Sequence, residues 1–257
     1  MITFVSAWYI LKAKFDKTKY EEWFSNFLLN VKMFNLVIYT NKESKDMLLP
    51  YISNNHRIKL VIKPINEFYN YKYKTDWERN HQDNYLLNKM TDWELNMLWS
   101  EKISFVKDAM DNEYFSSDWY GWCDIGYFRG NNNDMTKQQL SGWPNHNVIN
   151  HLNKTKIHYA NICNNVNYFN NLISIVKDKN VNNLPRSAIP PDQMSIAGGF
   201  FLIYKNKIDW WHKTFDERLQ LYFKHNYLVK DDQMILLDCI ISEPNHFQLY
   251  NENHLKY

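Results

Sequence analysis

Asp124 belongs to the first of three groups of residues whose types and spacing could carry out chemistry. It lies in the aromatic-rich segment Trp119–Arg129, WYGWCDIGYFR, and Gly126 follows two positions later. Mg²⁺ and Mn²⁺ bind carboxylate oxygens, and one or two from the protein are enough where phosphate and water supply the other ligands. A glycine beside the carboxylate lets a ligand approach the backbone closely. The segment therefore predicts a cation site, with an ordinary turn at a strand end as the alternative.

The other two groups are a glycine pair and a pair of acids. Gly198 and Gly199 precede the apolar run FFLIY, and they remove side chains where a bulky ligand could lie against the backbone. A bulge or turn is the alternative for these glycines. Asp231, Asp232 and Gln233 come directly before another apolar run. Capping and the helix dipole favour Asp at such a helix start, but two adjacent acids followed by Gln exceed what capping requires.

Short apolar runs predict the strands that would hold these groups. Ile2–Ile10, Leu36–Thr40 and Arg57–Ile65 alternate with helical patterns, which predicts a parallel sheet. Trp119–Cys123 is almost continuously apolar, which is typical of a strand covered on both faces. Ligands of open parallel sheets bind outside the carboxyl ends of the strands, which is where Asp124 would lie. Later strand-like segments are Ile157–Cys163, Ser195–Tyr204 and His246–Tyr250.

Amphipathic spacing predicts helices between the strands. Apolar residues from Tyr20 to Val31 recur at helical spacing, and Thr18 and Glu21 before them have capping-box spacing. A helix from about 92 to 111 carries Lys102 in its apolar stripe, where a lysine either extends its stem along apolar surface or directs its ammonium at a phosphate. Further helices are predicted at Ser44–Leu49, ending near Pro50, and at Tyr168–Val176, Ile208–Tyr222 and Met234–Ile241.

Two long polar segments separate these elements. Residues 66–91 are too long for an ordinary connection and predict a functional flap or a substrate-facing insertion. Gly130–Lys156 is predicted to be an Asn-rich loop. We find no internal repeat, linker or break in composition. The prediction is therefore one α/β domain over residues 1–257, with a mostly parallel central sheet, helices on both faces and long aromatic-rich loops.

Bulk composition narrows the function classes. The chain has 257 residues, 45% of them apolar, and a net charge of +2, so one domain with a large core is expected. The only Lys-rich stretch, Lys12–Lys19, runs into acids and is interpreted as a solvated face, so neither nucleic acid nor an anionic membrane is an expected partner. Three widely separated cysteines predict buried thiols. We expect a soluble cytoplasmic protein, because no signal peptide or membrane-spanning run is found.

Taken together and in order, these segments resemble glycosyltransferases of the GT-A type. Such enzymes begin with a nucleotide-binding βαβ half, and then present an acidic motif, usually Asp-x-Asp, at a strand end. A small-residue strand and an acidic helix start follow. More closely, the chain resembles the HtrL/YibB-type family, a glycosyltransferase-like group, in the segments FVSAWYI, WYGWCDIGYFR, AGGFF and DDQ. The resemblance implies a GT-A-like Rossmann-type domain with a nucleotide-binding half of about residues 1–130 and an acceptor half of about 131–257.

The resemblance also implies a hexosyltransferase-like function. A sugar would move from a nucleoside-diphosphate sugar, such as a UDP-sugar, to a hydroxyl of a glycan, lipid or protein. Asp124 would hold the metal and the diphosphate, with His254 as a further metal ligand. Asp232 would be the general base, with Asp231 as the alternative. The residues implied to bind the nucleotide sugar are Ser6, Ala7, Tyr9, Lys102, Trp122, Arg129, Gly198, Gly199 and Gln233.

One departure from the GT-A pattern affects the expected cofactor. Asp-x-Asp would need an acid at position 122 or 126, and these positions hold Trp and Gly. The implied Mn²⁺ or Mg²⁺ would then depend on Asp231, His254 or mainly the diphosphate besides Asp124. Three other functions remain open. They are a carbohydrate-binding protein with Trp and Tyr as stacking platforms, a nucleotide-sugar-binding protein with a decayed active site, and a phosphohydrolase using the same acids.

Overall fold

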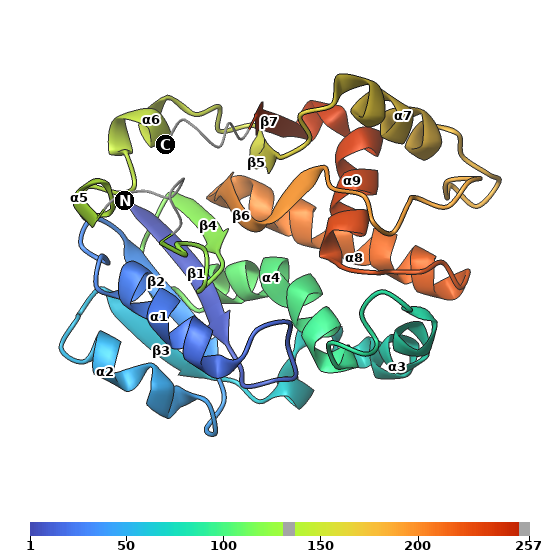
Figure 1. The fold of residues 1–257 in the computed structure, drawn as a ribbon. Coiled ribbons are helices and arrows are strands. Elements are labelled where there is room, and N and C mark those ends of the chain that lie inside the picture. Colours follow the sequence, from blue (N-terminus) through green and yellow to red (C-terminus); the bar gives the residue numbers. More distant parts are fainter. Residues whose placement is uncertain (131–136, 252–257) are drawn as a thin grey trace.

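A seven-stranded sheet with helices on both faces forms the centre of the computed structural model, which describes residues 1–130 and 137–251 (Figure 1). The strand order is β3-β2-β1-β4-β6-β5-β7. Every neighbouring pair is parallel except those that β6 makes with β4 and β5. The strands are β1 (Ile2–Trp8), β2 (Asn35–Thr40), β3 (Ile58–Ile62), β4 (Trp119–Cys123), β5 (Ile157–Asn161), β6 (Ile196–Tyr204) and β7 (Phe247–Asn251).

Helices connect most of the strands. They are α1 (Lys17–Leu28), α2 (Leu49–Ile52), α3 (Lys74–Asp83), α4 (Trp93–Asp111), α5 (Lys137–Ser141), α6 (His146–His151), α7 (Val166–Lys177), α8 (Ile208–Lys224) and α9 (Asp232–Ser242). The predicted fold class, α/β with a mostly parallel sheet covered on both faces, is confirmed. Within the described residues, no helix has the length and apolar content needed to cross a membrane.

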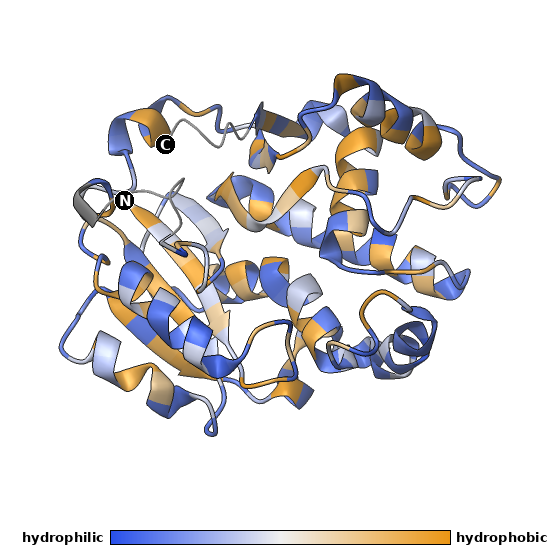
Figure 2. Ribbon diagram, viewed as in Figure 1, coloured by the Kyte–Doolittle hydropathy of each residue, from blue (hydrophilic) through white to orange (hydrophobic). Residues whose placement is uncertain are grey.

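Alternation along β1 divides the core between the two faces of the sheet. Phe4 and Trp8 pack in the cluster that includes Phe24 of α1. Val5 and Ala7, on the opposite face, pack in the larger cluster formed with α4, α8 and α9. Successive strand residues point to opposite faces, so a strand that is apolar at nearly every position must be covered on both sides. Figure 2 shows apolar colouring along the central strands and in stripes along the helices.

A close approach between β4 and β6 brings two of the predicted groups together. A Cβ at Gly121 would lie only 2.4 Å from the Phe201 carbonyl oxygen, so this position requires glycine. The antiparallel register places Cys123 opposite Phe200. One residue beyond the strand, the Asp124 backbone N–H donates to the Gly199 carbonyl oxygen at 2.8 Å. The pairing of β4 with β6 therefore puts the acid at 124 beside the glycine pair.

Residues 66–91, which the sequence predicts to be a functional flap or a substrate-facing insertion, contain regular structure. They contain the 3₁₀ turns Ile65–Glu67 and Tyr69–Tyr73 and most of α3, where Trp77 is fully buried against Phe223 of α8. Buried Glu101 of α4 accepts hydrogen bonds from the backbone N–H groups of Tyr69 and Asn70 at 2.6 and 2.9 Å. The segment is therefore a packed part of the domain.

Three local boundaries also differ from the predictions. Asp16 caps α1 by accepting from the N–H groups of Thr18 and Lys19, in place of the predicted Thr18–Glu21 capping box. Pro50 lies in the first turn of α2, where a missing N–H is tolerated, and does not end a helix. The predicted loop at 130–156 contains α5 and α6.

Candidate active site

Two adjoining cavities lie at the carboxyl ends of β1 and β4. The strand-end cavity, of about 360 Å³, includes Ala7, Tyr9 and Trp122 in its lining. The acidic cavity, of about 210 Å³, is lined by Gly198, Gly199, Asp231, Asp232 and Gln233 among others. Lys102, Asp124 and Arg129 line both cavities, so they form one continuous hollow. Its size and its position at the strand ends match those of ligand sites in open α/β sheets.

The Asp124 carboxylate is oriented by the strand that precedes it. Oδ1 accepts a hydrogen bond from Trp122 Nε1 at 2.6 Å, and the side chain remains 40% exposed. Trp122 is itself buried in the core beneath α4, with its ring stacked on that of Phe105. The indole therefore holds Asp124 in place while its carboxylate stays open to the cavity. Trp122, predicted to bind the nucleotide sugar, acts here through Asp124 as well as by lining the strand-end cavity.

Lys102 lies between the acids at 124 and 232. Its ammonium donates to the Gly198 carbonyl oxygen at 2.8 Å, and Nζ lies 3.1 Å from Asp232 Oδ2 and 3.4 Å from Asp124 Oδ1. Burial alone would lower the pKa of Lys102, but the Asp124 and Asp232 carboxylates outweigh it and raise the pKa above its usual value. The Lys102 side chain therefore brings its charge to the site and does not merely cover apolar surface.

The acids at the start of α9 face the acidic cavity. Burial raises the pKa of Asp232 to about 7; Lys102 opposes this shift, while Asp231 and Asp124 add to it. Asp231 Oδ2 lies 2.8 Å from Lys230 Nζ, whereas its buried Oδ1 has no hydrogen-bond partner among the described residues. Asp231 is the N-cap residue of α9, yet its side chain makes no capping hydrogen bond. Capping therefore does not account for Asp231, and its free oxygen can accept a donor from a ligand.

The glycine pair makes room for these carboxylates. A Cβ at Gly198 would lie 3.1 and 3.2 Å from the two carboxylate oxygens of Asp232, and a Cβ at Gly199 would lie 3.1 Å from Asp124 Oδ2. These separations are tighter than ordinary van der Waals contact, so a side chain at either position would displace an acid. The glycines were predicted to leave space for a sugar. In the structure they allow both carboxylates to approach the backbone of β6.

Two further cations border the cavities. Arg129 is exposed, with its guanidinium over the rings of Trp23 and Phe15 at 4.7 and 5.5 Å. Lys14 Nζ lies 5.5 Å from the ring centre of Trp99, and burial together with the charge of Lys230 lowers its pKa. Neither cation forms an ion pair within residues 1–130 and 137–251. Both can therefore attract an anionic ligand.

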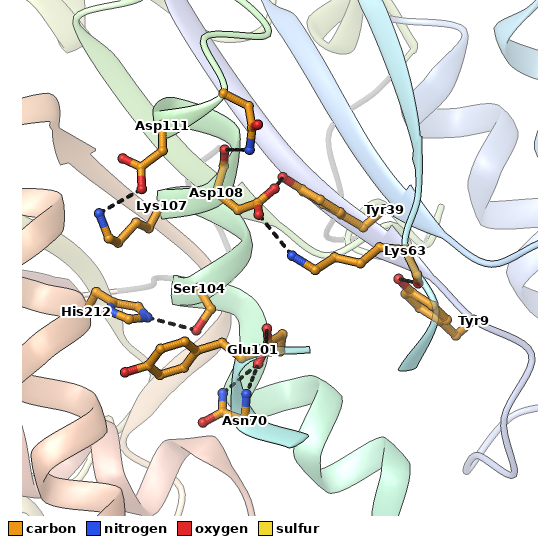
Figure 3. Close-up of polar contacts among 12 residues, drawn as sticks. Tyr9, Tyr39, Lys63, Asn70, Glu101, Ser104, Lys107, Asp108, Asp111 and His212 are labelled. Carbon is orange, nitrogen blue, oxygen red and sulfur yellow. Dashed lines mark hydrogen bonds and ion pairs between the residues drawn. The ribbon is translucent and has the colours of Figure 1, made fainter. Parts of the chain in front are cut away.

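Polar contacts hold helix α4 against the elements around it (Figure 3). Besides binding the backbone of 69–70, its side chains reach the sheet and α8. Asp108 accepts from the Tyr39 hydroxyl at 2.5 Å and from Lys63 Nζ at 2.9 Å. Ser104 Oγ lies 3.2 Å from His212 Nε2 of α8. These contacts fix the helix that carries Lys102, so its ammonium has a defined position relative to both acids.

The structure brings most of the predicted site residues together, with clear exceptions. Ser6 is fully buried on the strand face that it shares with Phe4 and Trp8, and it lines neither cavity. Tyr9 lines the strand-end cavity, but its hydroxyl donates to the Lys63 carbonyl oxygen. His254 lies outside the described residues. No residue of 66–91 lines either cavity, so this segment does not contribute a flap there.

Sequence reasoning missed the loop between β1 and α1. Lys14 and Phe15 line the acidic cavity, and Lys12 lines the strand-end cavity, although this lysine-rich stretch was interpreted as a solvated face. Trp99 of α4 also lines both cavities. The position of this loop in the sequence was the signal that could have identified it. This loop follows the carboxyl end of a central parallel strand, which is where ligands of such sheets bind.

The donor set does not fit a divalent cation held by the protein. No three His, Cys, Asp or Glu side chains gather as a metal site in the part of the chain that the structure describes. The space between the Asp124 and Asp232 carboxylates, where a shared cation would be expected, is taken by the Lys102 ammonium. The Mn²⁺ or Mg²⁺ implied by the family resemblance therefore has no matching arrangement among these residues.

Comparison with known proteins identifies the fold. No protein-family model and no curated protein sequence matches the chain. Among solved structures, it is similar to the galactosyltransferase LgtC in complex with donor and acceptor sugar analogues. The identity is 10%, the TM-score is 0.50, and the match covers 98% of this chain and 73% of that one. The fold is GT-A-like. The chain is also similar to apo mouse xyloside xylosyltransferase 1, with 13% identity, a TM-score of 0.49, and coverage of 96% and 84%.

Proposed function

We propose that this protein is a glycosyltransferase that moves a sugar from a nucleoside-diphosphate sugar to a hydroxyl acceptor. The observation that carries the proposal is the convergence of Asp124, the glycine pair, the acids at 231–232 and Lys102 around one hollow at the strand ends. The GT-A-like fold supports the same function. A UDP-sugar is the proposed donor, and a hydroxyl of a glycan, lipid or protein is the proposed acceptor.

The lining of the hollow suggests how the donor would lie. The strand-end cavity combines apolar walls from Leu95, Leu98 and Trp99 with backbone at the end of β1, which suits a base and ribose. Arg129 and Lys14 line the acidic cavity, and we propose that the diphosphate would lie beside them. Cleavage of the anomeric C–O bond leaves negative charge on the diphosphate, and cations placed beforehand at that position stabilise it. The sugar would then lie toward the glycine pair.

The acids at the start of α9 would act on the acceptor. In an inverting transfer, the acceptor oxygen forms a bond to the anomeric carbon while the bond from that carbon to the diphosphate oxygen breaks. The acceptor proton passes to a general base, and the nucleoside diphosphate leaves. Asp232 is the proposed base, because a pKa of about 7 suits proton transfer at neutral pH. The unpaired Oδ1 of Asp231 would accept a hydrogen bond from the acceptor, and Asp231 is the alternative base.

Release of nucleoside diphosphate tests this proposal. The protein would be incubated with UDP-, GDP- and CDP-sugars and a panel of glycan acceptors, and the nucleoside diphosphate formed would be measured. We expect turnover with one donor and a loss of about 10²- to 10⁴-fold in Asp232→Asn. Asp209→Asn is the control, because the Asp209 side chain is 74% exposed and lines neither cavity. Wild-type turnover by Asp232→Asn would refute the assigned base.

A nucleotide-sugar-binding protein without turnover is the second candidate. It is favoured by one observation, namely that the Lys102 ammonium already occupies Asp232 Oδ2. The two functions separate cleanly in the same assay. A binding protein would bind a nucleotide sugar without releasing nucleoside diphosphate, with every acceptor in the panel.

A further inference from the structure

We propose that the Lys102 ammonium replaces the divalent cation of this site, so that the donor diphosphate binds without a metal ion. This inference rests on the proposed function and specifies how that function would handle charge. The family resemblance implies a metal ion at this site, but the described side chains do not gather as a metal site.

The Lys102 ammonium lies close to both carboxylates of the site. Lys102 Nζ lies within 3.4 Å of an oxygen of Asp124 and within 3.1 Å of an oxygen of Asp232. Asp124 directly follows β4 and Asp232 begins α9, and these two elements are far apart in the chain. A cation that bridged the two acids would take carboxylate oxygens from both of them. The lysine thus holds together the same two carboxylates that a bridging cation would hold.

The Lys102 ammonium also has a nearby acceptor for each of its hydrogen-bond donors. A lysine ammonium has three donors, and the three nearby acceptors are the Gly198 carbonyl, Asp232 Oδ2 and Asp124 Oδ1. Asp124 Oδ1 also accepts from the Trp122 indole. A metal ion at this place would have to displace a buried lysine whose helix is anchored on its other sides. It would also meet like-charge repulsion from the ammonium if the lysine stayed.

The charges around the hollow would allow a diphosphate to bind without a metal ion. Without a cation between them, Asp124 and Asp232 would repel a diphosphate, and Lys102 offsets that charge. Direct contacts to the diphosphate are then left to Arg129 and Lys14, which form no ion pair within the described residues. The pKa of Lys14 is lowered partly by Lys230, so cations already crowd this edge. An incoming anion would relieve that crowding, and no metal ion is needed for it to bind.

Calorimetry with and without metal tests the inference on the wild-type protein. UDP, GDP and CDP would each be titrated in excess EDTA and again in excess MnCl₂. We expect one of them to bind with dissociation constants that agree within about threefold under the two conditions. If affinity in EDTA is at least tenfold weaker, the metal-free inference is wrong while the proposed function stands. If none of the three binds under either condition, both are overturned.

A lysine variant supplies an independent readout. Lys102→Met keeps the length of the stem but removes the charge, which leaves Asp124 and Asp232 facing each other. We expect it to bind the nucleoside diphosphate at least tenfold more weakly in EDTA and to bind MnCl₂ alone, which the wild type does not. Lys205→Met is the matched control, because Lys205 is half-exposed and pairs with the surface acid Asp118. Mn²⁺ binding by the wild type equal to that of Lys102→Met would overturn the inference, and the EDTA titration remains decisive if the variant does not fold.

Discussion

Replacing Asp232 by Asn should change how protein stability depends on pH. Burial raises the pKa of Asp232 from 3.8 to about 7, so in the folded protein the carboxyl holds its proton more tightly than in the unfolded chain. A raised folded-state pKa contributes stability that is complete below the unfolded value and is lost as the pH rises through the folded one. The wild type should therefore lose stability relative to Asp232→Asn between about pH 4 and pH 7.

The size of this effect follows from the shift. At 1.36 kcal/mol per pKa unit, the whole contribution is about 4 kcal/mol, and about 3 kcal/mol of it falls between pH 5 and pH 8. Burial also raises the pKa of Glu101 to about 7, which adds a similar slope to the wild type. Because Glu101 is present in both proteins, the difference between wild type and Asp232→Asn isolates Asp232.

Urea denaturation at several values between pH 5 and pH 8 measures the difference. The free energy of unfolding of the wild type minus that of Asp232→Asn should fall by about 3 kcal/mol across this range. Asp209→Asn, on the surface, should change stability by less than about 1 kcal/mol throughout. A wild-type-minus-Asn difference that stays constant from pH 5 to pH 8 would refute the argument that burial controls Asp232.

Three other results are expected. Gly198→Ala should lower activity and the free energy of unfolding by about 1–3 kcal/mol, because the new methyl group crowds the Asp232 carboxylate. Gly142→Ala is the control, because a Cβ there would have no atom closer than 3.8 Å, and it should be near neutral in urea denaturation and turnover. Equal effects of the two substitutions would contradict the crowding. Glu101→Ala should lower the free energy of unfolding, measured in urea, by about 2–5 kcal/mol, because it leaves the backbone N–H groups of residues 69 and 70 unpaired. A decrease below about 1 kcal/mol would show that these two hydrogen bonds do not anchor the segment. With Asp232 as the base, kcat/KM should fall about tenfold per pH unit below pH 7, and a profile flat down to pH 5 would exclude that role.

The parts of the fold that could be predicted are those with strong apolar periodicity. The runs ITFVSAWYI and WYGWC are apolar at nearly every position, and both are strands of the central sheet. The position of Asp124 in a ligand site followed from a general rule about where parallel sheets bind ligands, whereas its convergence with the acids at 231–232 was implied by the family resemblance. Strand β6 brings the glycine pair to the site, and no residue type in the sequence predicts that this strand runs antiparallel to β4. The antiparallel pairing of β4 with β6 sets the Asp124–Gly199 hydrogen bond.

The parts that could not be predicted depend on contacts between distant residues. The segment 66–91 is ordered by Glu101 and by the burial of Trp77 against α8, and neither contact leaves a periodic signal. The sequence allows two interpretations of Lys102, because a lysine in an apolar stripe has the same spacing whether its ammonium reaches water or a pair of acids. Ser6 could have been excluded, since alternation along β1 places it on the face opposite Ala7.

Hydrogen–deuterium exchange with a bound nucleotide sugar tests the central claim most directly. The claim is that segments far apart in the chain line one active-site hollow. With the tightest-binding sugar nucleotide of the panel, we predict slower exchange at 9–16, at 124–129, at 198–199 and at 231–233 in the same experiment. Slower exchange in only one of these segments, or only elsewhere in the chain, would contradict the account.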